Sequence, residues 1–342
     1  MQHLLSSGPL LDGKGALVEA GYATSLVKAY DRKAIKGGAA RIKEWDYYLI
    51  YNGRYGVALT IADNAYMGLL SASFLDFEAK TEKTVSPMFW LPFGRTKFPS
   101  RSDAGDIAKR VKGASGSFTH EAGGRRLRFH IDKFDGDKAF DCDLLLSDPP
   151  RDTMVIATPF DEKKTAFYYN QKIVAMRAAG SFTIGNETRR FDPADSFGLL
   201  DWGLGVWTYT NTLYWGGGQG FSNGHVIGFN LGYGFGNVSA ASENMIFVDG
   251  VCHKLDRVTF NIPVKDGKDD FLSPWTFTSN DGRFETAFTP ILDRAAYTCV
   301  GPLLSDQHQV FGYMDGTLTL DDGTKIELRR FLCFAEKVRN KW

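Results

Sequence analysis

Three acidic residues are the candidates for chemistry in this sequence. Asp201 and Glu243 stand near the two ends of a segment, residues 201–244, that is dense in Trp, Tyr, Gly and Asn, and Asp293 follows a predicted strand. A carboxyl group in a dry, apolar pocket has a raised pKa and can donate a proton to a substrate. We therefore treat Asp201, Glu243 and Asp293 as candidate catalytic residues.

Each of these acids also has an ordinary structural role open to it. Asp201 could cap a turn or pair with a nearby basic group, because Asp commonly caps turns in Gly-rich loops. Glu243 lies among small residues, where it could be solvated. Asp293 and Arg294 are adjacent, so in a strand they would point to opposite sides and need not form an ion pair. Both interpretations of each acid stay open at this point.

Aromatic and polar side chains of the second half are candidates for ligand contacts. Asn230 lies in a strand pattern, where its amide either points into a cavity or satisfies backbone groups. For a lone histidine such as His253, a surface or core position is the ordinary alternative to a site. A neutral imidazole at His308 could frame a polar site, and solvation at the edge of a strand is its ordinary alternative. The candidate ligand-binding residues are Trp202, Trp207, Tyr209, Trp215, Asn230, Tyr233, Asn244, His253 and His308, of which Tyr209, Asn230 and His253 would orient the acids.

Several familiar kinds of site have no support in the sequence. The run 232–236 (GYGFG) matches neither the GxGxxG nor the GxxxxGK[ST] phosphate-binding pattern, and there is no HExxH or GxSxG motif. The histidines lack metal-ligand spacing, and the four cysteines form no CxxC pair. We therefore expect no metal, no nucleotide cofactor and no serine nucleophile.

The elements that would position these residues are predominantly strands. Residues 46–51 and 55–62 are two apolar runs separated by Asn52-Gly53, the strongest short-range signal for a hairpin. Similar short runs separated by turn residues continue along the chain, which is typical of a sandwich or barrel. Residues 17–30 and 104–111 could form short helices, although neither has an apolar stripe at helical spacing. The sequence thus predicts an all-β protein with few short helices.

The composition limits the possible partners. The 342 residues include 40 Lys and Arg against 40 Asp and Glu, so the net charge gives no electrostatic argument for nucleic acid or an anionic membrane. No stretch approaches the ~20 apolar residues that a membrane-spanning helix needs. Residues 1–15 lack the pattern of a signal peptide. We expect a cytoplasmic protein without stable membrane insertion, in an oligomeric state that the sequence leaves open.

A set of short motifs is spread over nearly the whole chain. They are LLD (10–12) with Gly15, IKEWDYY (42–48), DWG (201–203) with Trp207 and Trp215, GFNLGYGFG (228–236), SEN (242–244), HKL (253–255), PILDR (290–294), HQVFG (308–312), FAE (334–336) and NKW (340–342). Together these motifs resemble the bacterial family catalogued as domain of unknown function 2804. The chain departs from the expected pattern at Gly203, where a basic residue should follow Asp-Trp.

A more distant resemblance links the chain to the lipocalin-like double-barrel group that includes tocopherol cyclases and carotenoid 1,2-hydratases. It implies two calycin-type antiparallel β-barrels packed together, and we place the domains at residues 1–195 and 196–342, with a boundary between 147 and 200. It also implies an aromatic-lined pocket for a lipophilic small molecule and no cofactor. Likeness of fold is weak support for a particular reaction.

Three functions follow as hypotheses. The first is a cofactor-independent cyclase, hydratase or isomerase that acts on an isoprenoid- or polyketide-like molecule. The second is a non-catalytic carrier or binding protein for a lipid, which the same aromatic lining would suit. The third is a carbohydrate-active β protein, which would need two carboxyl groups placed across a cleft.

Overall fold

Antiparallel β-sheets make up almost the whole of the computed structural model, which describes residues 2–341. A 14-stranded sheet runs in the order β7-β6-β5-β4-β16-β14-β12-β11-β10-β9, with β2, β8, β13 and β15 paired to its sides. Its strands are β2 (Gly21–Ala23), β4 (Ile42–Tyr51), β5 (Tyr55–Asp63), β6 (Met67–Asp76), β7 (Thr81–Val85), β8 (Met88–Trp90), β9 (Ile107–Val111), β10 (Ala114–Glu121), β11 (Gly124–Asp135), β12 (Lys138–Ser147), β13 (Met154–Pro159), β14 (Phe167–Ile184), β15 (Glu187–Phe191) and β16 (Phe197–Val206).

A nine-stranded sheet holds most of the remaining chain, in the order β20-β19-β18-β17-β27-β26-β25-β24-β21. Its strands are β17 (Thr210–Ser222), β18 (His225–Tyr233), β19 (Met245–Val248), β20 (Val251–Lys254), β21 (Val258–Asn261), β24 (Trp275–Ser279), β25 (Phe284–Val300), β26 (Leu303–Thr319) and β27 (Lys325–Lys341). The small pairs β1 (Gly8–Pro9) with β3 (Lys28–Ala29) and β22 (Val264–Lys265) with β23 (Lys268–Asp269), and the 3-10 turns η1 (Arg32–Ala34) and η2 (Ala39–Arg41), complete the elements.

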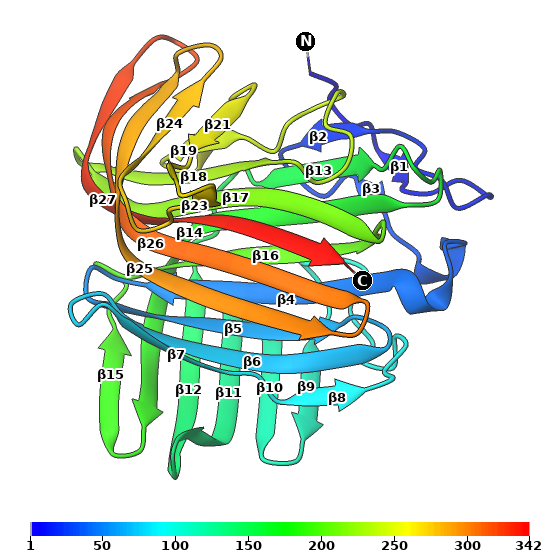
Figure 1. Cartoon of the computed structure of the whole chain (residues 1–342), viewed down its shortest axis with the longest axis horizontal. Coiled ribbons are helices and arrows are strands. Elements are labelled where there is room, and N and C mark those ends of the chain that lie inside the picture. The colour runs from blue at the N-terminus through cyan, green and yellow to red at the C-terminus, as the bar shows by residue number, and fades with distance from the viewer. Residues whose placement is uncertain (1, 342) are drawn as a thin grey trace.

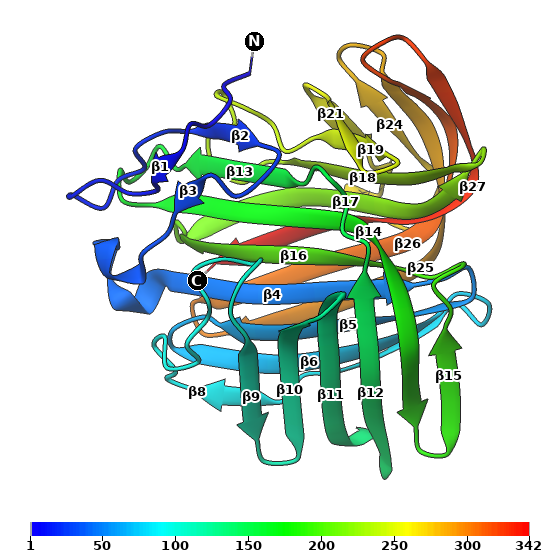
Figure 2. The same ribbon diagram turned by 180° about the vertical axis from the view of Figure 1, so that it is seen from behind.

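Both large sheets curl, and they pack against each other (Figure 1). Seen from behind, strands β9 to β12 and β15 lie below the long strands β4 and β16. Strands β18, β21 and β24 of the second sheet lie above them, and β25 and β26 lie at about their height (Figure 2). The prediction of two packed antiparallel barrels is confirmed in this architecture. The chain passes from the first sheet to the second between β16 and β17. The domain boundary at residue 195 stays a prediction.

The local predictions have mixed outcomes. The Asn52-Gly53 hairpin is confirmed, because β4 and β5 pair from Tyr51 opposite Gly56 onward, and the Asn52 side chain accepts hydrogen bonds from the backbone of the turn. The helix at 104–111 is wrong. Residues 107–111 form β9, in which Ile107 is buried and every second residue is exposed, so pairing with β10 outweighs a weak helical tendency. The helix at 17–30 is also wrong, since that region holds β2 and β3.

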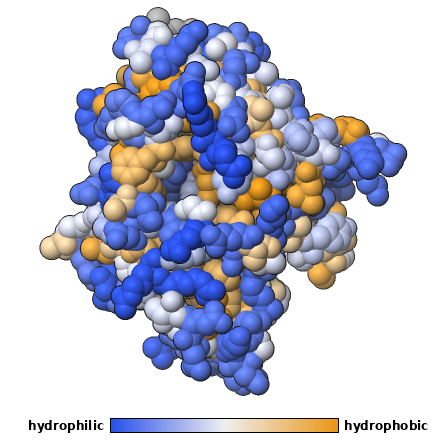
Figure 3. Space-filling model, turned by 90° about the vertical axis from the view of Figure 1, so that its left-hand side faces the viewer, coloured by the Kyte–Doolittle hydropathy of each residue, from blue (hydrophilic) through white to orange (hydrophobic). Residues whose placement is uncertain are grey.

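Apolar side chains fill three layers: the interior of the first sheet, the interior of the second, and the space between them. Alternate residues of a strand point to opposite faces, so β4 contributes to two layers. Tyr48 and Ile50 pack inside the first sheet, whereas Tyr47, Leu49 and Tyr51 face the second. The outer surface is different, because the face shown in Figure 3 is mainly hydrophilic, with hydrophobic residues gathered near its middle. The layer between the sheets is where the polar residues of interest lie.

Candidate functional site

A cavity of about 350 Å³ lies between the two sheets, and we call it the inter-sheet cavity. Its volume is at the lower end of the range of ~300–1,000 Å³ for small-molecule pockets. The sequence-based hypothesis placed a pocket inside a barrel. The barrel interiors are instead filled by apolar side chains, and this cavity opens where the outer faces of the two curled sheets meet.

One wall of the cavity is a row of side chains across neighbouring strands of the first sheet, which we call the first row. Backbone register places Lys172 of β14 opposite Asp201 of β16, Asp201 opposite Tyr47 of β4, Tyr47 opposite Thr60 of β5, and Thr60 opposite Ser71 of β6. Residues opposite each other in an antiparallel pair share a face. All five side chains therefore point to the same side, and all five line the cavity.

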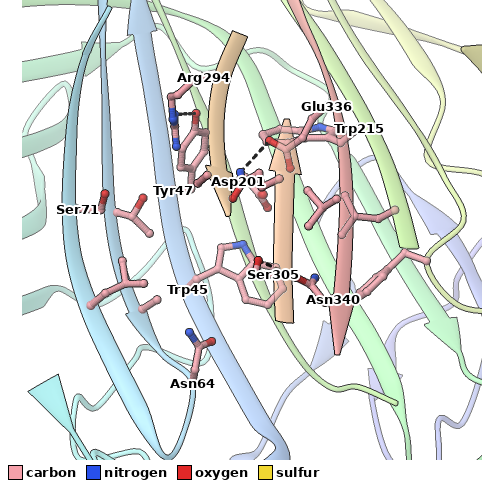
Figure 4. A pocket seen from close by; sticks show the side chains of 18 of the residues that line it. Trp45, Tyr47, Asn64, Ser71, Asp201, Trp215, Arg294, Ser305, Glu336 and Asn340 are labelled. Carbon is pink, nitrogen blue, oxygen red and sulfur yellow. Dashed lines mark hydrogen bonds between the residues drawn. The ribbon is translucent and has the colours of Figure 1, made fainter. Parts of the chain in front are cut away.

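The facing wall is a matching row in the second sheet, the second row. Trp215 of β17 lies opposite Glu336 of β27, Glu336 opposite Gln309 of β26, and Gln309 opposite Arg294 of β25. Of these four residues, Trp215, Glu336 and Arg294 line the cavity. In Figure 4, Trp215 and Glu336 lie across from Tyr47 and Ser71, whereas the Arg294 guanidinium reaches over to the Tyr47 hydroxyl. The site is thus built by residues far apart in sequence that share one face of each sheet.

Direct contacts join the two rows. The Nζ of Lys172 lies 4.2 Å from the ring centroid of Trp215. The Tyr47 hydroxyl lies 3.3 Å from both amide atoms of Gln309, and Arg294 Nη1 donates to it at 3.4 Å. The rings of Tyr47 and Trp215 meet edge to face at 5.8 Å. These contacts hold the two sheets in a fixed relation around the cavity.

Asp201 is held by two donors. Lys172 Nζ lies 2.7 Å from Asp201 Oδ1, and Asn170 Nδ2 donates to the same oxygen at 2.6 Å. Only 4% of the Lys172 side chain and 11% of the Asp201 side chain are exposed, so this ion pair is largely removed from water. A buried pair of this kind fixes geometry, because either charge alone would be costly there.

Glu336 is a buried acid of the cavity with a raised pKa. Burial raises the pKa of its carboxyl from an ordinary 4.5 to about 7, although Arg294 and the amide of Gln307, which donates at 3.3 Å, oppose that shift. The residue is only 6% exposed. A carboxylic acid that is half protonated near neutral pH is suited to donate and recover protons.

Glu243 is a second acid whose pKa is raised, again mainly by burial. Asn230 Nδ2 donates to its backbone oxygen at 2.8 Å and to its Oε2 at 3.3 Å. The Asn230 Oδ1 accepts from Trp215 Nε1 at 2.8 Å, which connects Glu243 to the second row. Asn230 therefore positions Trp215 and Glu243 without itself lining the cavity.

One end of the cavity is aromatic. The ring of Trp45 stacks with Tyr168 at 6.2 Å and meets Trp207 edge to face at 5.4 Å, and Trp207 meets Phe235 at 4.9 Å. All four residues line the cavity. The site therefore combines an apolar aromatic end with a polar middle that holds acids and cations, and this arrangement suits proton transfer to an apolar molecule.

Gly203 explains the departure from the expected family motif. A Cβ at this position would lie 2.1 Å from Trp45 Cζ2 and 2.6 Å from Asn170 Nδ2. The Trp45 indole occupies the space that a side chain at residue 203 would need. A basic residue is therefore incompatible with this packing of the aromatic end.

Substitution of this glycine gives a first prediction. Gly203→Val should lower the free energy of unfolding by about 1–3 kcal/mol, because overpacking must displace Trp45 or the sheet. Urea denaturation followed by tryptophan fluorescence measures the change. Gly53→Ala is the control, since a Cβ added there has nothing within 4 Å. Equal stability of G203V and the parent chain would show that Trp45 moves away freely.

Four of the sequence-predicted site residues line the cavity: Asp201, Glu243, Trp207 and Trp215. The segment 201–244 forms one part of the wall rather than most of it, through Asp201, Trp207, Leu213, Tyr214, Trp215, Phe235 and Glu243. The remaining lining residues come from β4 to β7, from β14 and from β25 to β27.

The structure places the other predicted residues outside the lining. Trp202 points into the first barrel and packs against Tyr169. Tyr209 is 43% exposed, and its hydroxyl donates to the Pro302 carbonyl. Tyr233 stacks on Tyr214 at 4.4 Å, and its hydroxyl accepts a hydrogen bond from a backbone amide.

The remaining predicted polar residues also have local partners. The Asn244 side chain accepts from Gly232 N at 2.7 Å and donates to the Asp256 carbonyl. His253 pairs with Asp321, and His308 pairs with Asp293 at 2.7 Å. The structure therefore does not bring Asp293, His253 or His308 to the cavity.

Sequence reasoning missed Glu336, Lys172 and Arg294 as site residues. The sequence does contain a signal for Glu336. Leu332 and Phe334, four and two residues before it, are apolar and lie on the same face of the strand, so the acid stands where the alternation predicts a buried apolar residue. The signal for Lys172 is weaker: it is a cation that directly precedes the apolar run 173–176, in a strand that also contains Asn170, Gln171 and Arg177. In each case a charged side chain stands where the strand pattern requires a buried one.

Among residues 2–341, no group of three or more His, Cys, Asp or Glu side chains is arranged to hold a metal ion. No helix among the described residues is long and apolar enough to cross a membrane.

Comparison with solved structures finds alignments that cover more than nine-tenths of the chain. A putative AttH from Nitrosomonas europaea aligns with a TM-score of 0.51 and 12% identity, over 92% of this chain and 98% of that one. Kievitone hydratase from Nectria haematococca aligns with a TM-score of 0.45 and 10% identity, over 98% of both chains. CghA in complex with Sch210972 aligns with a TM-score of 0.46 and 10% identity, over 97% of both chains. At such identities, the likeness to AttH shows a shared fold only.

Comparison with known sequences identifies the family. No curated protein matches the chain. The family described as a domain of unknown function, DUF2804, matches residues 2–342. This match confirms the resemblance that the sequence motifs indicate, and the chain belongs to the DUF2804 family.

Proposed function

We propose that the chain binds a lipophilic small molecule, isoprenoid- or polyketide-like, in the inter-sheet cavity and catalyses its cyclisation, hydration or isomerisation without a cofactor. The observation that carries this proposal is Glu336, a buried acid with a pKa of about 7 that faces a cavity with an aromatic end. An acid of that pKa can both donate and accept a proton near neutral pH.

The proposed reaction begins with proton transfer from the Glu336 carboxyl to a carbon–carbon double bond or a carbonyl of the ligand. The resulting cation is captured by water in a hydration, or by a nucleophile of the same molecule in a cyclisation. The proton lost from that nucleophile, or in an isomerisation from a carbon next to the cation, returns to the Glu336 carboxylate, so no net proton is consumed. Faces of Trp45 and Tyr47 could stabilise the transient positive charge by cation–π interaction.

The charges of the cavity support this assignment of roles. Asp201 forms an ion pair with Lys172 and accepts a hydrogen bond from Asn170, which favours a fixed structural and electrostatic role for it. Glu243 has a raised pKa and serves as a second candidate acid. Of the three carboxyl groups, Glu336 lies in the second row, between Trp215 and Gln309.

The direct test combines native mass spectrometry with a conversion assay. The purified chain is incubated with a lipophilic extract of its source cells, and the bound and free small molecules are compared before and after. An enzyme would release a compound whose mass is raised by one water in a hydration, or is unchanged with a new retention time in a cyclisation or isomerisation. A ligand that binds and is recovered unaltered would instead make the chain a carrier, and absence of any bound molecule would contradict the proposal.

A further inference from the structure

Arg294 is the cation of the cavity that lacks an acidic partner. Its Nη1 donates to Gln309 Oε1 at 2.9 Å and to the Tyr47 hydroxyl at 3.4 Å, both neutral oxygens. Among the residues that the structure describes, no carboxylate lies within 4.0 Å of its guanidinium, and neither Nε nor Nη2 makes a hydrogen bond to protein. The other cation, Lys172, is matched by Asp201 at 2.7 Å. The Arg294 guanidinium thus lines the cavity without a direct ion pair, although its charge acts through space on the Glu336 carboxyl and opposes the rise of that pKa.

The surroundings of Arg294 suit the polar end of an amphipathic molecule. Ala295 and Ala296 follow it in β25, line the cavity and are exposed, so Arg294 lies close to where the cavity meets solvent. Gln307 and Ser305 of the adjacent strand add neutral hydrogen-bonding groups to the same wall. In Figure 4, Arg294 and Asn64 lie at opposite ends of the labelled side chains, with Trp45 nearer to Asn64. A ligand can therefore place a charged group at Arg294 and an apolar body toward Trp45.

We propose that the ligand of the inter-sheet cavity carries a carboxylate, which binds the guanidinium of Arg294 while the apolar remainder of the molecule occupies the aromatic end. This inference rests on the proposed function and names the chemical class of its substrate: an amphipathic monocarboxylic acid. Arginine recognises carboxylates through two parallel charge-assisted hydrogen bonds, and three of its five donors are free of protein partners here.

The charge balance of the cavity favours a single negative charge over two. Asp201, Glu243 and Glu336 also line the cavity and would repel a phosphate dianion. Burial raises the pKa of Glu243 and of Glu336, which reduces the negative charge that a carboxylate ligand meets. One guanidinium therefore matches one carboxylate.

The test compares two ligands that differ only at the polar end. 2-Naphthylacetate and the neutral 2-(2-naphthyl)ethanol are titrated into the full chain by isothermal calorimetry at pH 6.5. The parent chain should bind the carboxylate about tenfold or more tightly than the alcohol, since a charge-assisted contact typically contributes that much. Arg294→Gln should remove this preference while binding the alcohol as the parent does, and Arg294→Lys should keep part of it.

A matched control and two adverse outcomes make the test decisive. Arg329→Gln changes an arginine whose side chain is 81% exposed, and it should leave both affinities unchanged. Equal binding of the two probes by the parent chain, including no binding of either, would overturn the inference. A carboxylate preference that persists in R294Q would do the same. The extract assay tests the proposed function independently of this binding experiment, because absence of any converted product there would contradict the proposed reaction and not the carboxylate preference.

Discussion

Glu336→Gln should lower turnover of the native substrate by about 10²–10⁴-fold while leaving its binding within a few-fold of the parent chain. General acid–base catalysis typically contributes an acceleration of that size. The amide keeps the shape and most hydrogen bonds of the acid, including the partnership with Gln307, but cannot release a proton. Initial rates by liquid chromatography, together with the dissociation constant of the substrate, separate the two effects.

The pH dependence of the rate provides a second readout of the same residue. Burial raises the pKa of Glu336 to about 7, so the protonated acid predominates below pH 7 and the carboxylate above it. If protonation of the substrate limits the rate, activity should fall as the pH rises through about 7. The E336Q variant should lose this transition along with most of its rate.

The control for Glu336 lies on the same strand. Glu327 is also in β27, but 58% of its side chain is exposed and its partner is Arg329. Glu327→Gln should therefore leave both the rate and its pH profile unchanged. Turnover in E336Q equal to that of the parent would exclude Glu336 as the acid and transfer the role to Glu243.

The fold follows from sequence patterns that act over short range. Alternation of side chains and the Asn52-Gly53 turn indicate antiparallel strands, because period-two burial and the turn are local properties. Strands buried on both faces are harder to assign. In β4, Tyr48 packs inside the first barrel and Tyr47 faces the second sheet, and both are aromatic. The sequence does not distinguish these two apolar environments.

The site depends on which face each side chain takes, and a shift of one residue changes that face. Asp293 and Arg294 illustrate the effect, since the sequence singles out the acid while the cavity receives the arginine. An irregularity in β25 between Pro290 and Leu292 contributes. Phe288 packs inside the second barrel, whereas Leu292, four residues later, faces the space between the sheets. A prediction that alternates the faces of β25 residue by residue across this irregularity therefore assigns the later side chains to the wrong face of the sheet.

Long-range register accounts for the rest of the site. Glu336 meets Trp215 only because β27 returns beside β17 after a separation of more than one hundred residues. The two rows then face each other because two separate sheets pack together, and local propensity does not encode that arrangement. Asp201 and Glu243 are candidates because they stand near the two ends of the aromatic-rich segment 201–244, whereas Glu336 lies outside that segment.

Removal of either partner of the buried Lys172–Asp201 pair should be costly for stability. Asp201→Asn leaves the Lys172 ammonium buried beside Trp215 without its carboxylate, and Lys172→Met leaves the Asp201 carboxylate with only the Asn170 amide. Each single substitution should lower the free energy of unfolding by about 3–5 kcal/mol, as is typical when one member of a buried ion pair is lost. Urea denaturation at constant pH measures both.

The double variant distinguishes a mutual interaction from two independent packing defects. Lys172→Met with Asp201→Asn removes both charges, so its loss should be smaller than the sum of the two single losses, and it can fall below either one. The exposed pair Arg329–Glu327 is the reference, and breaking it should cost less than about 1 kcal/mol. Strictly additive losses at Lys172 and Asp201 would show that their charges do not stabilise one another. Non-additive losses would show that Lys172 and Asp201 stabilise each other and together hold β14 against β16 beneath Trp215. Asp201 would then have a structural role, which leaves proton transfer to Glu336.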